Sequence, residues 1–425
     1  MLFAVVLFWG LHLGYPVHQL QHIRWTLFGY LVPVYYFFTV LPMVGIATVV
    51  LALKRHWTKW ELIWCLLPLI CLPGILQSDD SVWSVRQCLS WVVRGLVPGG
   101  IIFIVAHRKQ AESQLVHGIY PVIIGASLLG LMELYFDHNP LWDKSLTPIP
   151  VTAQPDNPFY RPVPPPIIPS TIGRPQGTQG NRIPYAAVLV AFLPIGLWLL
   201  KYGEKGSYWA RLAALGALFS ILLLAQVRAV WVSMVAAILL MHVVRLHQDL
   251  RLRIIAGLLV GVGIFLAFPK TRDLLWTRLS SFRFTERSIQ ARIEVLQTVK
   301  VLREHGLWGV GFGQFPTACK PYYPRTLVWN NTPDNQYLRW TIENGVLAFG
   351  LLLAFFVGLI RAGWKRIQLM PDSRQADFYK SLLVGWASIA VTFLFFDGFY
   401  WAACNMTFWC FLGLFAVCLK PERGN

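Results

Sequence analysis

Apolar runs recur along the whole chain and are separated by short polar or basic segments. A helix needs roughly 20 apolar residues to cross the hydrocarbon core of a bilayer, and most of these runs approach that length. They predict about twelve spanning helices, at residues 1–14, 28–53, 60–76, 88–106, 116–135, 183–200, 209–226, 229–246, 253–269, 343–361, 381–398 and 402–419. The fold class expected is therefore an all-α polytopic membrane protein, with one transmembrane domain over residues 1–425.

Basic residues gather in alternate connections between these runs. If the spans alternate in direction, the basic connections all lie on one side, and the positive-inside rule assigns that side to the cytoplasm together with both termini. No cleavable signal peptide is expected, because the first apolar run lacks a basic leader. The residues concerned are Lys54, Arg55, Lys59, Arg108, Lys109, Lys201, Lys205, Arg211, Arg245, Arg251, Arg253, Arg361, Lys365, Arg366, Arg374, Lys380, Lys420 and Arg423.

Two long segments fall on the opposite side, which would face the periplasm. Residues 136–182 are rich in proline and glycine and predict an extended loop. Residues 270–342 contain a helix signal that Ser288 can begin and Gly306 can end. Lysine and arginine greatly outnumber acidic residues in this second loop, which indicates either a solvated face, contact with anionic lipid headgroups, or an anion site built from arginines.

Composition agrees with a membrane protein. The chain has 425 residues, of which 56% are hydrophobic and 13% charged, against roughly 25% charged in soluble proteins. A net charge of +17 would suggest a nucleic-acid partner for a soluble protein, but here most of it falls in loops that orient the chain. We therefore expect membrane lipids, and no nucleic acid, as surroundings.

Arg228 is the most informative single charge. It lies in "LLLAQVRAVWVSM", at a very tight turn between two apolar spans and on the same side as the basic loop. An arginine beside hydrocarbon is costly unless it finds a partner or extends to the interface. Either outcome is open for Arg228, whereas extension to the interface is the favoured interpretation of Arg86 and Arg94.

Three motifs resemble the O-antigen ligase and polymerase family of bacterial inner-membrane glycosyltransferases. "QVRAVWVSMVAAILL" is similar to its Ser-Arg-Gly-x-Trp turn, and "QARIEVLQTVKVLREHGLWGVGFGQF" to its arginine-containing helix and glycine-rich segment. "DNQYLRWTIENGVLAFG" is similar to its His-Asn-x-x-Leu motif and the span that follows. The similarity covers roughly residues 183–420, while the first half matches mainly in its number of spans.

The resemblance implies a GT-C-like membrane fold of about twelve helices, with a large periplasmic loop between the ninth and tenth. It implies transfer of a glycan from undecaprenyl pyrophosphate to an acceptor hydroxyl, without a metal, a cofactor or a nucleotide sugar. The acceptor would be a glycan or a lipid-anchored molecule, and a polysaccharide chain-length regulator is a candidate partner. Arg228 and Arg292 match the family's arginines and would stabilise the pyrophosphate leaving group, assisted by Arg287 or Arg283.

Asp334 stands where the family's ligases have histidine. It could position the acceptor hydroxyl and accept its proton, or it could only cap the helix that begins near Gln336, a role open to Asn335 as well. Glu343 could hold an arginine in place. Asn335 and Tyr337 could line the sugar path, although Tyr337 and Trp340 are equally typical of aromatic belts at a membrane interface.

Other functions remain open on sequence grounds. A transporter or flippase for a polar lipid or anionic solute is the alternative, but the two halves show no convincing repeat of the kind that transporters contain. A non-catalytic assembly subunit is a third. The sequence shows no compelling metal cluster, since His305 and Asp334 have no partner at ligand-like spacing. The loss of the ligase histidine favours a polymerase, or a ligase with a different acceptor.

Overall fold

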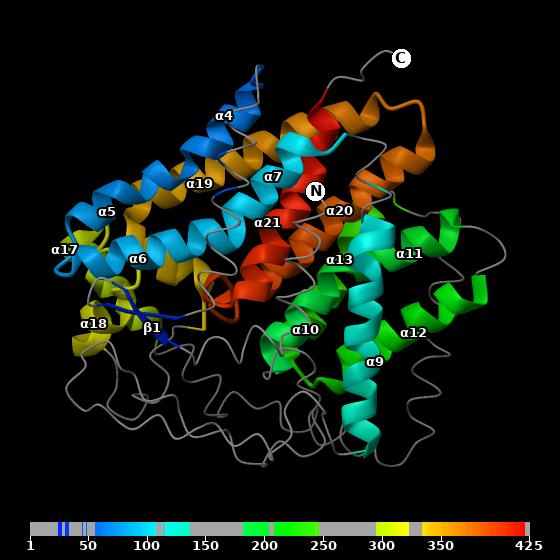
Figure 1. The fold of residues 1–425 in the computed structure, drawn as a ribbon, viewed down its shortest axis with the longest axis horizontal. Helices are drawn as coiled ribbons and strands as arrows, with labels where there is room; N and C mark the ends of the chain where they lie inside the picture. Colours follow the sequence, from blue (N-terminus) through cyan, green and yellow to red (C-terminus); the bar gives the residue numbers. More distant parts are fainter. Residues whose placement is uncertain are drawn as a thin grey trace.

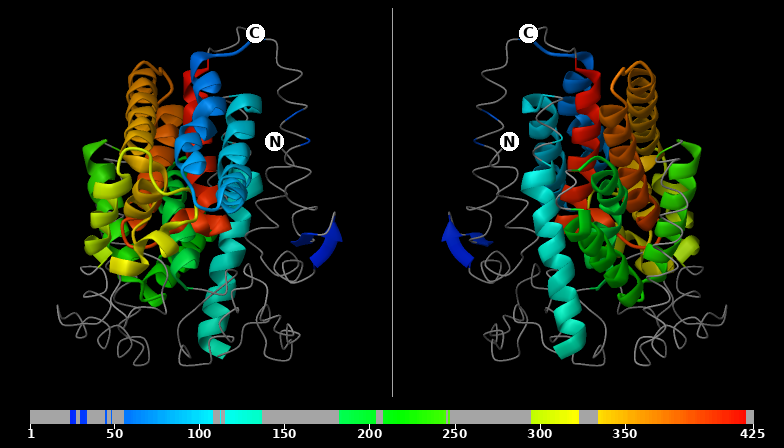
Figure 2. Two further views of the ribbon diagram at one scale, coloured as in Figure 1. Left: turned by 90° about the vertical axis from the view of Figure 1, so that its left-hand side faces the viewer. Right: turned by 90° about the vertical axis from the view of Figure 1, so that its right-hand side faces the viewer.

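The computed structural model describes residues 24–27, 30–33, 45, 48, 56–107, 112, 115–136, 182–203, 208–244, 246, 295–322 and 334–420. Within these ranges the main helices pack side by side as a bundle (Figures 1 and 2). They are α4 (Lys59–Leu66), α5 (Leu72–Leu76), α6 (Ser81–Trp91), α7 (Val97–Val105), α9 (Tyr120–Phe136), α10 (Arg182–Ala191), α11 (Leu193–Tyr202), α12 (Tyr208–Leu224), α13 (Arg228–Val243), α17 (Val301–His305), α18 (Phe315–Cys319), α19 (Gln336–Gln368), α20 (Ser373–Thr392) and α21 (Ala402–Ala416).

Short 3₁₀ or π segments extend or join several of these helices. They are η1 (Leu67–Cys71), η2 (Val92–Leu96), η3 (Leu115–Ile119), η7 (Leu296–Lys300), η8 (Lys320–Tyr322), η10 (Gly398–Tyr400) and η11 (Val417–Leu419). Pro68, Pro73 and Pro98 each stand near the start of the segment that follows a change in helix geometry. Proline lacks the N–H that a continuous α-helix would need there, so these sites favour a change of winding.

Six helical stretches in the described part of the chain are long and apolar enough to cross a membrane. They are Lys59–Leu76, Ser81–Val105, Leu115–Glu133, Arg182–Tyr202, Gln336–Gln368 and Ala402–Leu419. Each coincides with a predicted span, and the shorter apolar helices Tyr208–Leu224 and Arg228–Val243 coincide with two more. The protein is thus a polytopic membrane protein, as the apolar runs predict.

Of the remaining predicted spans, two cannot be compared with the structure and one is wrong at its start. Residues 1–14 and 253–269 lie outside the described residues. The predicted helix at 28–53 is wrong at its start, because β2 (Tyr30–Pro33) pairs antiparallel with β1 (Arg24–Leu27). Elsewhere the described elements are helical.

Helix α20 covers the predicted span at 381–398 but begins and ends earlier. Asp372 caps its start, since the Asp372 carboxylate accepts a hydrogen bond from the Arg374 N–H at 2.9 Å. After Thr392 the chain leaves the helix and turns through η10 before α21. The polar residue Asp397, predicted inside the span, therefore lies in the turn between α20 and α21.

Contacts between helix termini define one end of the bundle, here named the Asp334 end. The Gln336 N–H at the start of α19 donates to the Phe393 carbonyl just after α20, at 2.9 Å. The Cys404 thiol near the start of α21 lies 3.5 Å from the Pro184 carbonyl near the start of α10. Figure 1 shows α17, α18 and the turn between α5 and α6 at this end as well.

Basic side chains occupy the opposite end. The Lys420 ammonium donates to the Ile104 and Ala106 carbonyls at 2.7 and 2.9 Å, and Lys201 pairs with Asp377 at 3.3 Å. The Trp198 indole binds the Arg374 carbonyl at 3.0 Å. The gathering of these basic segments at one end agrees with the alternation of spans that the sequence predicts.

Candidate functional site

Helix α19 begins next to Asp334. Asn335 is the N-cap, because its side-chain oxygen accepts a hydrogen bond from the Leu338 N–H at 3.0 Å, an interaction that stabilises a helix by about 1 kcal/mol. Asp334 has φ +46°, in the left-handed region. The cap is therefore Asn335 and not Asp334, while the place of Asn335 along a sugar path stays a prediction.

A buried charge network lies just inside α19. Arg339 is 4% exposed and Glu343 is fully buried. The Arg339 Nε donates to Glu343 Oε1 at 3.0 Å, and its Nη1 donates to Asp397 Oδ2 at 2.8 Å. Glu343 therefore holds an arginine, as the sequence predicts, and that arginine is Arg339.

Tyr400 completes the network from the turn between α20 and α21. Its hydroxyl donates to Glu343 Oε2 at 2.5 Å, and its ring lies under the Arg339 guanidinium, with 3.4 Å from the guanidinium carbon to the ring centre. A buried charge is costly unless it is paired and hydrogen-bonded. Arg339 and Glu343 each have partners in more than one segment, and Asp397 pairs with Arg339, so the network fixes α19 against the turn before α21.

The glycine-rich segment after α17 packs into a break in α19. Gly345 has φ +86° and interrupts the helical backbone. The Val310 and Gly311 N–H groups donate to the Ile342 and Glu343 carbonyls at 3.0 and 2.9 Å. The break thus frees helix carbonyls, and the glycine-rich segment satisfies them.

Two aromatic residues of α19 are structural rather than interfacial. The Tyr337 hydroxyl donates to the Ala390 carbonyl of α20 at 2.7 Å. Trp340 is 1% exposed and its ring packs against that of Trp91, with 6.1 Å between ring centres. The interface-belt interpretation is therefore wrong for Trp340, which belongs to the core.

Arg228 starts α13, as the tight-turn motif predicts. Only three residues separate α12 from α13, and among them Gln226 adopts φ +52°. Further along α13, the Ser233 and Thr392 hydroxyls lie 2.8 Å apart, and Thr392 ends α20 beside the start of α19. The turn that carries Arg228 therefore lies at the Asp334 end. Arg283, Arg287 and Arg292 lie outside the described residues.

Burial and neighbouring charge act on Asp397, which lies outside the spanning helices. Burial of the carboxyl away from water raises its pKa from 3.8 to about 6. The positive charge of Arg339 opposes this rise, and the negative charges of Asp334 and Glu343 add to it. Asp334 is thus close enough to interact electrostatically with Asp397. Glu304, Arg303 and His305 lie farther along the same end, on α17.

The raised pKa of Asp397 predicts a pH dependence of stability. Between about pH 4 and 6 the folded protein binds the proton more tightly than the unfolded chain, so this group's contribution to stability falls as pH rises through that window. Thermal unfolding of the purified protein in detergent, followed from pH 4 to 8, should show this loss. Asp397→Asn should show a smaller loss over the same window, and an unchanged profile would contradict the assignment.

Asp397 and Tyr400 are the site residues that the sequence analysis missed. Both lie in "FFDGFYW": Asp397 falls inside the predicted span at 381–398, and Tyr400 falls in the short gap before the next predicted span. The available signal was the aspartate itself, because an acidic residue in an apolar run is costly and marks a functional or paired position. Within the described part of the chain, no group of three or more His, Cys, Asp or Glu residues could hold a metal ion.

A family comparison bears on this end of the bundle. Residues 213–353 match a family described as O-antigen ligase (Wzy_C). The match covers about a third of the chain, from α12 through the Arg228 turn and the glycine-rich segment to the first half of α19. A comparison with curated proteins finds no match. Residues 213–353 thus match the family that the three motifs indicate, which confirms the resemblance over this part of the chain.

Proposed function

We propose that the protein transfers or polymerises a glycan, taking it from an undecaprenyl-pyrophosphate donor and joining it to an acceptor hydroxyl. The observation that carries this proposal is the placement of the Arg228 turn and Asp334 at one end of the bundle, within the residues that match the O-antigen ligase family. The Asp334 end would face the periplasm of a bacterial inner membrane, because the basic segments gather at the other end.

The chemistry requires stabilisation of a leaving group more than protonation of it. The acceptor oxygen forms a bond to the anomeric carbon while the bond from that carbon to the pyrophosphate oxygen breaks. Negative charge builds on the pyrophosphate, and an arginine fork suits phosphate oxygens. Arg228, with Arg292 and assistance from Arg287 or Arg283, would supply this stabilisation without a metal ion.

Asp334 would receive the proton of the acceptor hydroxyl. Its left-handed backbone sets it immediately before the capped first turn of α19, and Asp397 interacts with it electrostatically. The buried network of Arg339, Glu343 and Asp397 would hold this corner rigid. Asn335, whose side-chain oxygen caps α19, and Tyr337, whose hydroxyl binds the Ala390 carbonyl, would line the sugar path beside Asp334.

The decisive test is transfer by purified protein in proteoliposomes. Synthetic undecaprenyl-pyrophosphate oligosaccharide serves as donor, and released lipid and enlarged glycan are both measured. Arg228→Ala should lower turnover about 100-fold, the effect of losing one preorganised donor to a developing anion, and Asp334→Asn should lower kcat by about 100-fold. Arg292→Ala tests the partner arginine.

Arg361→Ala is the matched control. This arginine is exposed and lies in the second half of α19, toward the opposite end, so its loss should leave turnover within about twofold. If the Arg228, Arg292 and Asp334 variants are inserted in the membrane and their turnover equals that of the wild-type protein, the proposed site is wrong. Movement of donor across the vesicle without any new glycosidic bond would indicate a flippase instead.

A further inference from the structure

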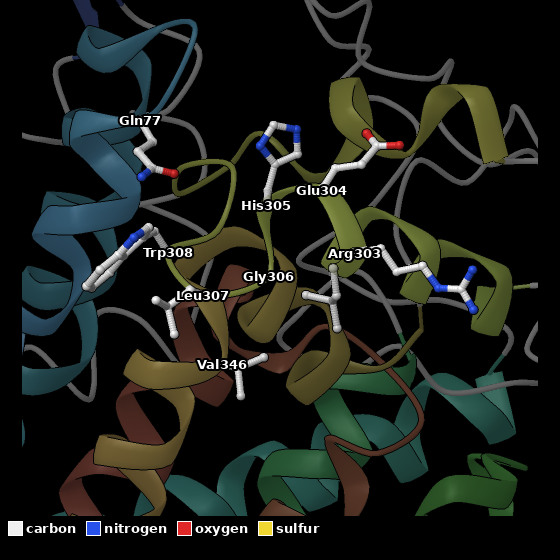
Figure 3. A pocket seen from close by; sticks show the side chains of 9 residues that line it. Gln77, Arg303, Glu304, His305, Gly306, Leu307, Trp308 and Val346 are labelled. Carbon is white, nitrogen blue, oxygen red and sulfur yellow. The ribbon is translucent and has the colours of Figure 1, made fainter.

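A pocket opens beside the break in α19, and Arg339, Glu343, Asp397 and Tyr400 are not among the residues that line it. It has a volume of about 570 Å³ and is lined by α17, the segment that follows it, the end of α5 and Val346 (Figure 3). The glycine-rich segment connects the two places: its start at 306–308 lines the pocket, while Val310 and Gly311 bind the backbone of α19 next to the network.

The pocket has a polar side and an apolar side. Gln77, His305 and Glu304 lie along one rim in Figure 3, whereas Leu307 and Val346 lie on the other. The apolar pair is well exposed, at 56% for Leu307 and 50% for Val346. A pocket divided in this way fits an amphiphile, with a polar headgroup at the rim and an apolar chain below.

The apolar side continues along the surface of α19. Val346, Leu353 and Val357 are each about half exposed, and their spacing of seven and four residues places them on one helix face. In a spanning helix such a face lies against lipid chains. An occupant of the pocket can therefore keep its alkyl chain in the bilayer while its headgroup enters.

The polar side suits a sugar better than a phosphate. Glu304 contributes a carboxylate, which would repel an anion, and the Tyr322 hydroxyl holds that carboxylate in place at 2.8 Å. The Arg303 side chain extends away from Gln77 and His305 (Figure 3). An amide, an imidazole and a carboxylate can exchange hydrogen bonds with sugar hydroxyls, and Trp308, 37% exposed, offers an apolar ring face.

We propose that this pocket binds the sugar headgroup of a lipid-anchored acceptor. The assignment of the bound amphiphile as the acceptor rests on the proposed function. Binding of a sugar-headed amphiphile in this pocket does not depend on it. The pocket would hold the acceptor next to the glycine-rich segment, whose other part contacts α19 beside Glu343. Trp308 and Gln77 are then residues that bind the acceptor and have no part in stabilising the pyrophosphate.

A binding experiment tests the site without requiring catalysis. The probe is dodecyl maltoside with a diazirine in its alkyl chain, added to full-length protein in phospholipid nanodiscs, and mass spectrometry locates the photolabel. We expect labelling of the 302–308 and 346–353 peptides, competition by unlabelled dodecyl maltoside, and roughly tenfold weaker labelling in Trp308→Ala. Trp57→Ala is the control, because Trp57 is 38% exposed and precedes α4, at the other end of that span.

Three results would overturn the site. They are labelling unchanged in Trp308→Ala, competition by dodecyl phosphate as strong as by dodecyl maltoside, and competition by dodecanol as strong as by dodecyl maltoside. The second would indicate an anionic-lipid site, and the third a site for the chain alone.

The transfer assay separates this inference from the proposed function. With a lipid-anchored acceptor, Trp308→Ala should raise the acceptor KM about tenfold and leave kcat within twofold, while Asp334→Asn lowers kcat. If wild-type protein forms no glycosidic bond but the photolabel result holds, the proposed function fails and the sugar site stands. If transfer proceeds and the acceptor KM of Trp308→Ala is unchanged, the pocket is not the acceptor site.

Discussion

Arg339→Leu is expected to cost about 3 to 5 kcal/mol of folding free energy and to abolish transfer. The substitution leaves Glu343 and Asp397 buried without their shared cation, and removing one partner of a buried ion pair strands the other charge. The purified variant should show a strongly lowered midpoint of thermal unfolding in detergent, or should fail to accumulate in membranes.

A triple variant distinguishes pairing from packing. Arg339→Leu combined with Glu343→Gln and Asp397→Asn removes all three charges and should recover much of the lost stability, because no charge is then left unpaired. The matched control is Arg374→Leu, whose partner Glu112 is partly exposed in an ion pair at the opposite end. That change should cost no more than about 1 kcal/mol. Equal losses for Arg339→Leu and Arg374→Leu would contradict the role assigned to the network.

Gly309→Ala is expected to be severely destabilising, although it adds only one methyl group. A Cβ at Gly309 would lie 2.5 Å from both the Glu343 carbonyl oxygen and the Gly345 nitrogen, and the residue has φ +82°. The clash is with backbone on both sides, so it cannot be relieved by rotating a side chain. We expect the variant to lose several kcal/mol of stability, on the order of a severe core defect, together with transfer activity.

The control for this prediction lies in the same helix that Gly309 contacts. At Gly350 a Cβ would meet nothing within 4 Å, so Gly350→Ala should leave unfolding unchanged or stabilise the protein by up to about 1 kcal/mol through helix propensity. Thermal unfolding of the two variants, prepared identically, provides the comparison. A Gly309→Ala protein as stable as Gly350→Ala would show that the glycine-rich segment does not pack as described.

The sequence predicted the described spanning helices well because lipid imposes a simple rule. Every helix that crosses a bilayer needs an apolar run of suitable length, so Lys59–Leu76 and Ala402–Leu419 could be recognised from hydropathy alone. The tight turn before Arg228 and the helix end at Gly306 also follow from local residue types. The hairpin at 24–33 did not, because a short apolar run has no periodicity that separates strand from helix.

The candidate site was only partly predictable. Glu343 could be expected to hold an arginine, and Arg339 lies only four residues before it on the same helix. The contact of Glu343 with Tyr400 spans 57 residues of chain, which the sequence pattern does not reveal. Either Asp334 or Asn335 could cap α19 by residue type. The backbone conformation makes Asn335 the cap, and that conformation cannot be derived from one sequence. The pocket beside Val346 was beyond prediction, since it exists only because Gly345 breaks α19 and admits the segment that follows α17.

The length of α19 has a consequence for where the reaction would take place. After the break at Gly345 the helix continues to Gln368, and at about 1.5 Å per residue this part alone measures about 35 Å, more than the roughly 30 Å hydrocarbon layer. Its uncharged middle, between Glu343 and Arg361, spans only about 26 Å by the same rise. The length of this uncharged part therefore places Glu343 and Arg339 at one boundary of the hydrocarbon layer. A thicker bilayer would bring those charges closer to the hydrocarbon, so lipid chain length becomes a means of changing the surroundings of the proposed site.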